Sequence, residues 1–507
     1  KIRKEALTAG PRNTLASKKM KYKIILLLAF LHLKNPGYGQ NVGIGVENPV
    51  QKLHVNGAVK IGSTNTNDSG TIRWNSVKND FEGYVGDRWL SFTGGRSQWG
   101  NTEQYATESY GVVADFARDT LFGELISHAN EKLAISIPKA ENGIYKNSGT
   151  VRIHTLNSSG QPGYRHNLYP PVYSDNSFFG KGVDLNKSIL YNELVVGEPG
   201  ATADGNLQQG KAYVYKLNAN TGEPGTPQAL LQTGVAGDPF DKFGSTVAIN
   251  GDFIAVAATE KSVNGNSKQG RVYMYKRIYI LNQPTDAFTF DATITPADGT
   301  AQMMFGSAIS LQPGCMAIAA PNATVNGAAN AGKVYIYRRI NNTWQLEATL
   351  PNPTGNAGQF FGKSISINQA GDTLAIGAPD YLFSPGKAYL YVKNNNSWTY
   401  STQFSQGTIQ RADAFGCAVD FLNGKLLVGV KEANVGINYQ QGKAILYTRS
   451  GGGWHREALF TAQNGEANLL FGSSVQLTPN MAIISAPGYT NTQFRAEKGK
   501  VFWFLNQ

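Results

Sequence analysis

Between Phe361 and Tyr391 the chain reads FGKSISINQAGDTLAIGAPDYLFSPGKAYLY, a stretch that repeats with variation over most of the sequence. A Phe-Gly pair opens each unit, and successive pairs are 54 to 64 residues apart. The seven pairs are Phe122-Gly123, Phe179-Gly180, Phe243-Gly244, Phe305-Gly306, Phe361-Gly362, Phe415-Gly416 and Phe471-Gly472. A period of this length is typical of a fold built from stacked repeats. The repeat therefore indicates the architecture more strongly than any single residue does.

The fourth repeat shows how each unit divides into four short strands. Its apolar and β-branched runs, separated by Gly-, Pro- and Asn-rich turns, cover residues 305–311, 316–320, 333–337 and 344–350. Turns of this chemistry connect antiparallel neighbours, so each unit is predicted to be a four-stranded meander. The two middle strands are apolar on both faces, which is typical of sheets that are covered on each side.

A radial stack of such sheets provides that cover, and seven units fall within the usual range for a closed propeller. The sequence therefore predicts an all-β fold: a seven-bladed β-propeller of four-stranded antiparallel blades, in which each recurrent Phe fills the gap between neighbouring blades. An open solenoid is the structural rival, but it would need polar capping repeats. The last unit instead stops near Phe504 without a fourth strand, so we expect residues 99–120 to complete it and close the ring.

The repeats resemble the FG-GAP repeat family, the propeller type also seen in integrin alpha subunits. The resemblance rests on the Phe-Gly pairs and on the Gly-Ala-Pro turn at 377–379 with its variants at 197–199, 319–321 and 485–487. It also rests on the Gly-Lys steps that begin at Gly210, Gly332, Gly386, Gly442 and Gly499. It covers residues 122–505 and implies the propeller fold. Repeats one, three and six depart from the Gly-Ala-Pro pattern.

The N-terminal segment is charged and reads as a leader. Residues 1–40 carry nine Lys or Arg and one acid, or +8 of the formal net charge of +11, so nucleic-acid binding by the remainder is not expected. Met20 is the predicted start of a secretory signal peptide, with a basic region, an apolar run at 24–33 and small residues at 37–39. The apolar run is too short to span a bilayer, so no transmembrane span is expected in the mature chain.

We divide the chain into an upstream extension and signal peptide (1–39), a β-rich stalk and linker (40–98) and the propeller (99–507). Residues 41–97 contain short predicted β-strands separated by Gly residues, and none of these strands is long enough to form a hydrophobic core of its own. Short sequence motifs such as GTIRWN at 70–75 resemble those of short β modules in phage tail-fibre-like and bacterial surface proteins. That resemblance implies a stalk, with a homotrimer through the stalk as a candidate assembly.

No motif indicates a catalytic, metal or cofactor site, and we assign none. The six His residues lack zinc-ligand spacing, and no nucleophile elbow or phosphate-binding loop is present. Many members of the resembled family hold calcium between the first two strands; calcium stays an alternative here, although none of the seven turns carries three spaced carboxylates. Cys315 and Cys417 lie in predicted strands of non-neighbouring repeats and are expected to be small buried residues without a disulfide.

Binding is expected in the loops that a rigid scaffold carries. The longest join the second and third strands and are rich in Asn, Gly and Gln, a composition that suits a polar ligand and suits an inert surface loop equally well. The candidate ligand-binding residues are Glu198, Asp204, Asn264, Asn326, Asp380 and Asn434. The Tyr-x-Tyr pairs of the third strands favour packing between blades over a sugar-stacking platform; these residues are Tyr213, Tyr215, Tyr273, Tyr275, Tyr335, Tyr337, Tyr389 and Tyr391.

These features predict a secreted or cell-surface bacterial protein whose propeller acts in adhesion or recognition. Its expected partner is an extracellular glycan or protein. Two alternatives stay open. One is an extracellular hydrolase acting on polysaccharide or phosphoester, which would need acids or a metal at the central channel. The other is a purely structural role in a surface appendage.

Overall fold

The computed structural model describes residues 42–44, 53–55, 71–75, 80–85, 88–91, 104–107 and 122–505, the last range with gaps at 157–161, 231–236, 280–286, 381–383, 407–412, 451, 463–464, 489, 492–495 and 498. The chain divides into two compact units, Lys1–Gly95 and Arg96–Gln507. The predicted signal peptide lies outside the described residues. No helix in the described part of the chain is long and apolar enough to cross a membrane.

The first unit contains two small sheets. β1 (Val42–Ile44) pairs in parallel with β2 (Leu53–Val55). β3 (Ile72–Asn75), β4 (Asp80–Val85) and β5 (Arg88–Ser91) form an antiparallel sheet. These strands fall in the segment that the sequence divides into short β pieces. The role of this segment as a stalk stays a prediction.

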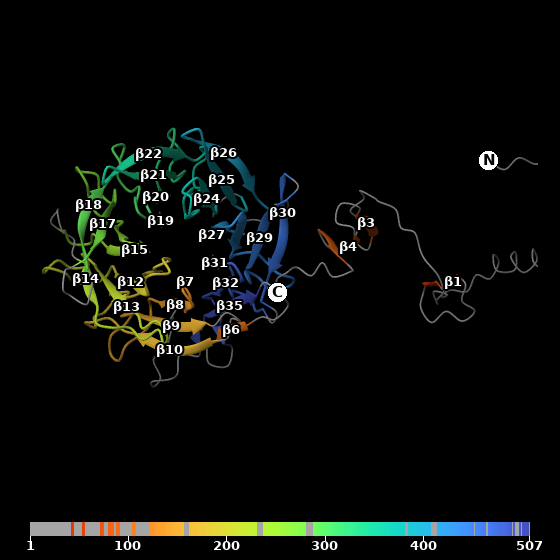
Figure 1. The fold of residues 1–507 in the computed structure, drawn as a ribbon, viewed down its shortest axis with the longest axis horizontal. Helices are drawn as coiled ribbons and strands as arrows, with labels where there is room; N and C mark the ends of the chain where they lie inside the picture. The colour runs from red at the N-terminus through yellow and green to blue at the C-terminus, as the bar shows by residue number, and fades with distance from the viewer. Residues whose placement is uncertain are drawn as a thin grey trace, which may run out of the picture. The chain divides into compact units, whose positions relative to one another are not determined.

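The second unit is a ring of seven antiparallel sheets with four strands each (Figure 1), so the predicted seven-bladed β-propeller is confirmed. We number the blades 1 to 7 by the order of their first strands along the chain. These first strands, which lie nearest the centre, are β7 (Ile126–Ala129), β11 (Gly182–Leu185), β15 (Phe243–Asn250), β19 (Ala308–Gln312), β23 (Ser364–Ile367), β27 (Phe415–Leu422) and β31 (Val475–Leu477). The second strands are β8 (Lys132–Ile137), β12 (Glu193–Glu198), β16 (Phe253–Ala258), β20 (Cys315–Ala320), β24 (Thr373–Ala378), β28 (Lys425–Val430) and β32 (Met481–Ala486).

The outer half of each blade follows the same order. The third strands are β9 (Thr150–Leu156), β13 (Lys211–Lys216), β17 (Arg271–Ile278), β21 (Lys333–Ile340), β25 (Lys387–Asn394), β29 (Lys443–Ser450) and β35 (Lys500–Leu505). The fourth, outermost strands are β10 (Pro162–Leu168), β14 (Gln228–Leu230), β18 (Ala287–Ile294), β22 (Thr343–Pro351), β26 (Ser397–Phe404), β30 (Gly453–Phe460) and β6 (Gln104–Thr107). A two-stranded hairpin, β33 (Thr490–Asn491) and β34 (Ala496–Glu497), lies within the last blade's loop.

The ring is closed by a strand from the beginning of the propeller unit. β6 pairs antiparallel with β35, with Gln104 opposite Trp503 and Thr107 opposite Lys500. The seventh blade therefore takes three strands from the end of the chain and its outermost strand from residues 104–107. The predicted closure by residues 99–120 is confirmed.

Each Phe-Gly pair joins two blades. The Phe361 ring is fully buried and its centroid lies 5.4 Å from that of Tyr389 in its own blade. Its backbone lies against Gly332 of the preceding blade, where a Cβ atom would come within 2.1 Å of the Phe361 carbonyl oxygen. The same contact recurs around the ring, between Gly149 and Phe179, Gly210 and Phe243, Gly270 and Phe305, Gly386 and Phe415, Gly442 and Phe471, and Gly499 and Phe122. The predicted place of the Phe side chains between blades is confirmed.

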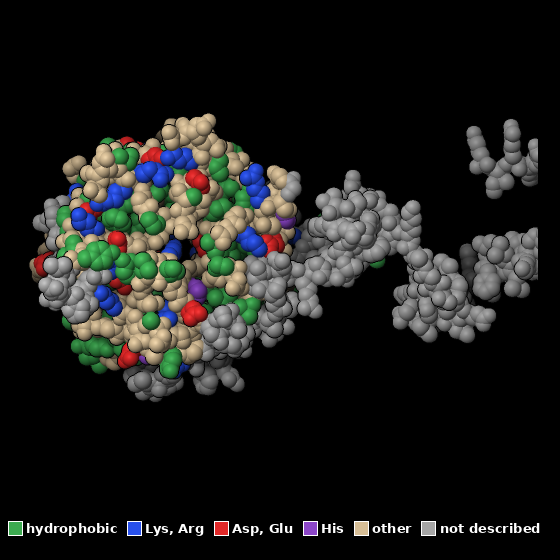
Figure 2. Space-filling view, in the orientation of Figure 1, with side chains coloured by type: hydrophobic (Ala, Val, Ile, Leu, Met, Phe, Trp, Pro, Cys, Tyr) green, Lys and Arg blue, Asp and Glu red, His purple; other side chains and the backbone are tan. Residues whose placement is uncertain are grey.

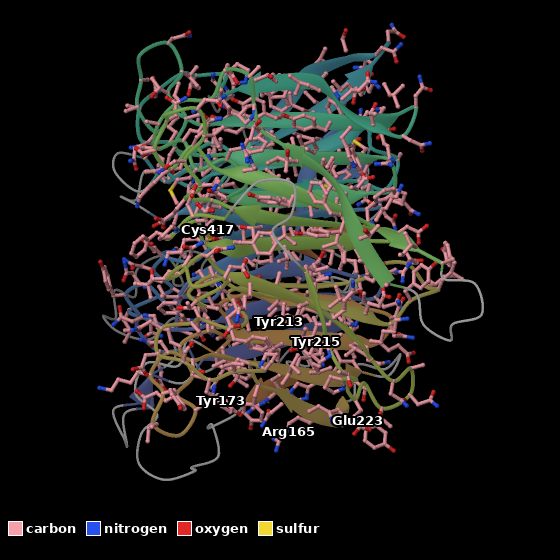
Figure 3. The ribbon with its side chains drawn as sticks, turned by 90° about the vertical axis from the view of Figure 1, so that its left-hand side faces the viewer. Arg165, Tyr173, Tyr213, Tyr215, Glu223 and Cys417 are labelled. Atoms are coloured by element: carbon pink, nitrogen blue, oxygen red, sulfur yellow. The ribbon has the colours of Figure 1, made fainter. Side chains whose placement is uncertain are left out.

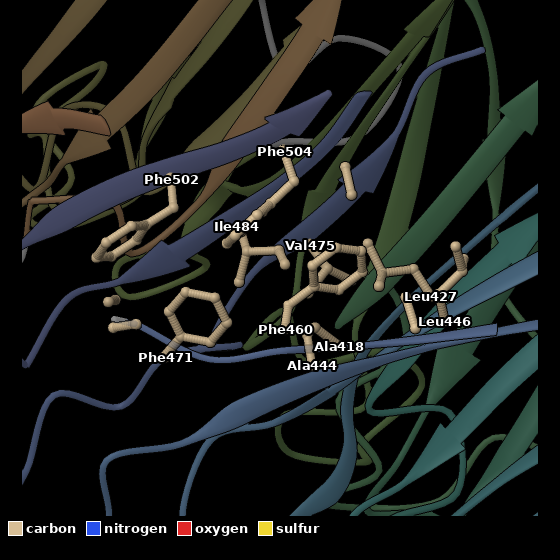
Figure 4. Close-up of a cluster of buried hydrophobic side chains, with 14 of the residues drawn as sticks. Ala418, Leu427, Ala444, Leu446, Phe460, Phe471, Val475, Ile484, Phe502 and Phe504 are labelled. Atoms are coloured by element: carbon tan, nitrogen blue, oxygen red, sulfur yellow. The ribbon is translucent and has the colours of Figure 1, made fainter. Parts of the chain in front are cut away.

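The hydrophobic core is divided among the blade interfaces. Figure 4 shows one of its clusters, which contains Phe471, Leu446 of blade 6, and Ile484 and Phe502 of blade 7. Because every blade is covered on both faces, its middle strands are almost wholly buried, as in β20 and β32. Cys315 is buried, Cys417 is half-buried, and both are free thiols.

The Phe-Gly contact can be tested by comparing two glycines that both have positive φ. Gly332 (φ 94°) lies against Phe361, whereas a Cβ at Gly314 (φ 76°), in the turn before β20, would meet nothing within 4 Å. We expect Gly314→Ala to lower the free energy of unfolding by about 1 kcal/mol through backbone strain alone. Gly332→Ala adds a backbone clash and should cost more than about 3 kcal/mol in chemical denaturation. Equal losses would contradict this role for Gly332.

The contribution of β6 to the stability of the ring can also be tested. A variant carrying both Tyr105→Pro and Ala106→Pro removes two consecutive N–H groups of β6, and so at least one bond to β35. We expect the full chain to lose about 3 kcal/mol or more of unfolding free energy, measured by denaturant titration. An unchanged midpoint would mean that β6 adds nothing to the stability of the ring.

Candidate functional site

Hydrogen bonds between first strands run around the central channel. The Asp184 carboxylate accepts a bond from Ser127 Oγ of blade 1 at 2.9 Å and from the Ile249 N–H of blade 3 at 2.9 Å. Asp420 acts in the same way between Ser366 of blade 5 (2.8 Å) and the Leu477 N–H of blade 7 (2.7 Å). The remaining interfaces are bridged by Asn250 to Leu311, Gln312 to Ile367, and Gln476 to His128. Each of the seven interfaces between blades is therefore bridged by a hydrogen bond at the channel.

A pocket of about 580 Å³ opens at the end of the channel where the first strands turn into the second. All seven blades line it, through residues that include Asn130, Ser188, Gly251, Pro313, Gln369, Leu422 and Pro479. Figure 2 shows one face of the ring, on which apolar, basic and acidic side chains are interspersed without a large patch of one charge. The pocket is thus central, polar in part and formed by the whole ring.

Much of the polar lining of this pocket already holds the ring together. Asn130 Nδ2, for example, donates to the carbonyl oxygens of Ser188 and Tyr191 at 2.8 and 3.1 Å. His128 Nε2 is buried and has no hydrogen-bond partner in the described structure. Burial, with a smaller contribution from Lys132, lowers the pKa of His128 to about 4, so its ring is neutral near pH 7. Among the described residues, no group of three His, Cys, Asp or Glu side chains could hold a metal ion.

The loops between second and third strands emerge at the opposite end of the blades, because an antiparallel meander reverses direction at each turn. In blade 3, Val263 and Asn266 exchange backbone hydrogen bonds of 3.1 and 2.9 Å across a two-residue turn. Asn264 at this turn has φ 49° and is followed by Gly265 with φ 84°. Asp204-Gly205 and Asn326-Gly327 form equivalent turns. Asn, Asp and Gly tolerate positive φ best, so backbone conformation alone accounts for these residue types.

The six candidate ligand residues lie on five blades and in two kinds of environment. Asp204, Asn264, Asn326 and Asn434 are exposed, and they can reach a ligand from solvent. Glu198 and Asp380 are buried, and both have local partners. Asp380 accepts a bond from Ser384 Oγ at 2.7 Å, and Glu198 accepts one from the Tyr213 hydroxyl at 3.1 Å. The loop residues stay candidates for binding.

The Tyr-x-Tyr pairs are packed in the interior, as predicted. Tyr213 and Tyr215 lie within the blade in Figure 3, and both are nearly inaccessible to solvent. Tyr273, Tyr335 and Tyr389 each lie edge-on to the Phe of their own repeat, with ring centroids 5.4 Å apart in every case. These rings form part of the blade interfaces and do not offer a platform for sugars.

A patch of exposed tyrosines on blade 1 was not predicted. Tyr145, in the loop between β8 and β9, stacks on Tyr173, in the connection to blade 2, with centroids 5.9 Å apart and planes 11° apart. Tyr169 lies 6.5 Å from Tyr173, and all three side chains are 37 to 42% exposed. Ile144 and Val172 beside them are more exposed still. Figure 3 shows Tyr173 and Glu223, which lies in a turn between third and fourth strands, toward opposite faces of the disc.

At this patch repeat one differs from repeats 2, 3 and 6, and this difference could have been noticed in the sequence. Repeat 4 also differs from them, with Ala328 at the position of Tyr145. At the position of Tyr145 the loops of blades 2, 3 and 6 carry Asn206, Asn266 and Asn438. Each of these Asn side chains donates to a Gln three residues later, at 2.7 to 3.0 Å. The equivalent loops of blades 2, 3 and 6 therefore fold without an aromatic residue at this position.

The geometry defines the class of the protein: a seven-bladed β-propeller whose blades each begin with a docked Phe-Gly pair. The family model described as "FG-GAP repeat" matches residues 235–275 and 288–337. The matched repeats and the seven-bladed ring together fit an FG-GAP β-propeller, a fold that suggests a module for recognition or protein interaction.

Comparison with solved structures finds a resemblance to the crystal structure of Saccharomyces cerevisiae Sqt1. The two chains are 12% identical, the alignment covers 77% of this chain and 97% of that one, and the TM-score is 0.41. No curated protein matches the sequence.

The buried carboxyl of Glu198 gives a pH-dependent prediction. Burial raises its pKa from 4.5 to about 7, against the opposing effect of hydrogen bonds from Ser177 and Tyr213. Between these two pH values the folded protein binds more protons than the unfolded chain, so stability falls as the pH rises through this window. Glu198→Gln should therefore raise the unfolding free energy by up to about 3 kcal/mol at pH 8 and by little at pH 4. Denaturant titrations at both pH values measure this.

The control is Glu223→Gln, because the Glu223 side chain is exposed. Because each variant loses one carboxyl group, Glu223→Gln shows how much of the effect of Glu198→Gln comes from losing a negative charge alone. A Glu198→Gln variant whose stability follows the same pH profile as the wild type would contradict the raised pKa.

Proposed function

We propose that the protein is a secreted or cell-surface recognition module that binds a polar ligand, a glycan or a protein, through the propeller face that carries the loops between second and third strands. FG-GAP repeats are typical of extracellular and surface proteins, which supports this location. The observation that carries the proposal is the exposed tyrosine patch of Tyr145, Tyr169 and Tyr173 on that face.

Tyrosine suits such a surface because its ring is apolar and its hydroxyl group is polar. It gives a large contact area while losing little conformational entropy, and it is enriched at binding surfaces. The inter-blade hydrogen bonds around the channel hold the blades that carry these loops, so a ligand would meet a preformed surface. A preformed surface loses less free energy on binding than one that must be ordered.

The test is a screen of purified residues 40–507 against arrays of glycans and of extracellular proteins, with calcium and again with a chelator. We expect a ligand whose affinity falls at least tenfold in a variant carrying Tyr145→Ser and Tyr173→Ser, equivalent to about 1.4 kcal/mol. Tyr164→Ser is the matched control, because Tyr164 is exposed on β10 but has no part in the patch. Equal loss in both variants would contradict the assignment. The chelator arm shows whether calcium is required.

The exposed loop residues can be tested without disturbing their turns. Asp204→Gly, Asn264→Gly and Asn326→Gly each keep a residue that accepts positive φ and remove only the side chain. If these side chains contact the ligand, the triple variant should bind it more weakly while its unfolding free energy stays within about 1 kcal/mol of the wild type. Undiminished binding would restrict the site to the tyrosine patch.

A trimeric stalk would place three propellers on one assembly and increase avidity without any new contact. Light scattering should then give a trimer for residues 40–507 and a monomer for residues 99–507. A monomeric mass for the longer chain would rule the assembly out.

A further inference from the structure

The fourth strands of blades 3 to 6 share a β-bulge, an extra residue that has no partner in the adjacent third strand. The bulge residues are Asp291 in β18, Glu347 in β22, Ser401 in β26 and Glu457 in β30. Bulges re-aim a side chain and are designed features of a sheet. Three of the four residues are acidic, and the exception is Ser401.

Two of these acidic residues bind a cation in the next blade. Asp291 Oδ2 lies 2.6 Å from Arg339 Nη1 of blade 4, and Glu347 forms an ion pair with Lys393 of blade 5. Arg339 and Lys393 occupy the same position, the seventh residue of the third strand. The outer parts of these two interfaces are thus each closed by a carboxylate from one blade and a cation from the next.

The interface between blades 5 and 6 keeps the cation and lacks the carboxylate. The seventh residue of β29 is Arg449, and the bulge residue that precedes it around the ring is Ser401. The Arg449 side chain is exposed and makes no ion pair or hydrogen bond with any residue that the structure describes. Its counterpart Arg339 has only 11% of its side chain exposed in its ion pair.

A groove of about 580 Å³ lies where the missing carboxylate would be. One wall consists of Ser401, Gln403 and Ser405, and the other of Arg449, His455 and Arg456. None of the described residues that line it is acidic. Its base is rigid, because the Phe404 ring packs against Tyr447 and Trp454 of blade 6, with centroids 4.8 and 5.3 Å apart.

The groove follows the edge of a strand. β26 is the outermost strand of its sheet, so one side of its backbone has no neighbouring strand. Residues 401–404 of β26, and Ser405 just beyond its end, line the groove. Because Thr402, Gln403 and Phe404 alternate between the two faces of the strand, a groove that meets all three must run along the edge and not across one face. Such an edge can accept an extended peptide as an additional strand.

We infer that this groove binds an acidic peptide in an extended conformation. A Glu or Asp side chain of the peptide takes the place opposite Arg449 that Asp291 and Glu347 take at the other two interfaces, and the peptide backbone pairs with the edge of β26. A uronic acid could also supply a carboxylate, but it could not continue the sheet. The site lies on the outer rim of the propeller, does not use the tyrosine patch, and does not depend on the function proposed above.

The experiment measures the binding of a fluorescent octapeptide of alternating Glu and Thr to residues 40–507 by anisotropy. A peptide with Gln in place of each Glu is the matched probe, and a uronate oligosaccharide is the second ligand class. We expect the Glu peptide to bind at least tenfold more tightly than the Gln peptide, and to bind more weakly as salt is added. Arg449→Gln should reduce binding at least tenfold, whereas Arg165→Gln, at an exposed Arg of blade 1, should leave it unchanged.

Ser401→Glu is the decisive variant, because it supplies the carboxylate that the other two interfaces have. It should abolish binding of the Glu peptide and raise the melting temperature, and the added Arg449→Gln change should remove that rise. Equal binding of the Glu and Gln peptides, or unchanged binding in Arg449→Gln, would overturn the inference. Binding of the uronate oligosaccharide in preference to the peptide would overturn it as well.

Discussion

The contact between each Phe-Gly pair and the glycine of the preceding blade is the constraint on which the ring depends. At this point the two backbones approach so closely that a single Cβ, as at Gly332, would meet the carbonyl oxygen of the next repeat. The Phe ring then fills the interface beside the Tyr of its own blade. One short motif therefore sets both the separation and the packing of neighbouring blades, and its repetition produces a closed ring.

The fold was largely predictable because it follows from periodicity. Seven Phe-Gly pairs gave the number of blades, and a last unit without a fourth strand indicated closure from the N-terminal side, which the pairing of β6 with β35 confirms. Surface properties were harder to predict. The sequence places Glu198 in a loop, but it ends a buried strand. The Tyr145 patch joins two loops whose proximity depends on the tertiary fold.

Differences between the repeats carry information about function. All blades pack against their neighbours in the same way. A residue type that occurs in one blade and not at the equivalent position of others is therefore not required by that shared packing. Tyr145 lies where three other blades have an Asn that hydrogen-bonds within its own loop. Ser401 stands where two neighbouring interfaces place an acid. Each departure leaves an exposed chemical group, an aromatic ring or a guanidinium, that a ligand can contact.

Residues 104–107 complete the seventh blade and so make the ring one cooperative unit. Hydrogen–deuterium exchange of the full chain, followed by mass spectrometry, tests it most directly. We expect peptides covering β6 to exchange as slowly as those covering β35, and both to become unprotected only when the whole ring unfolds. Exchange of β6 at the rate of an unstructured chain, with the other sheets still protected, would contradict it.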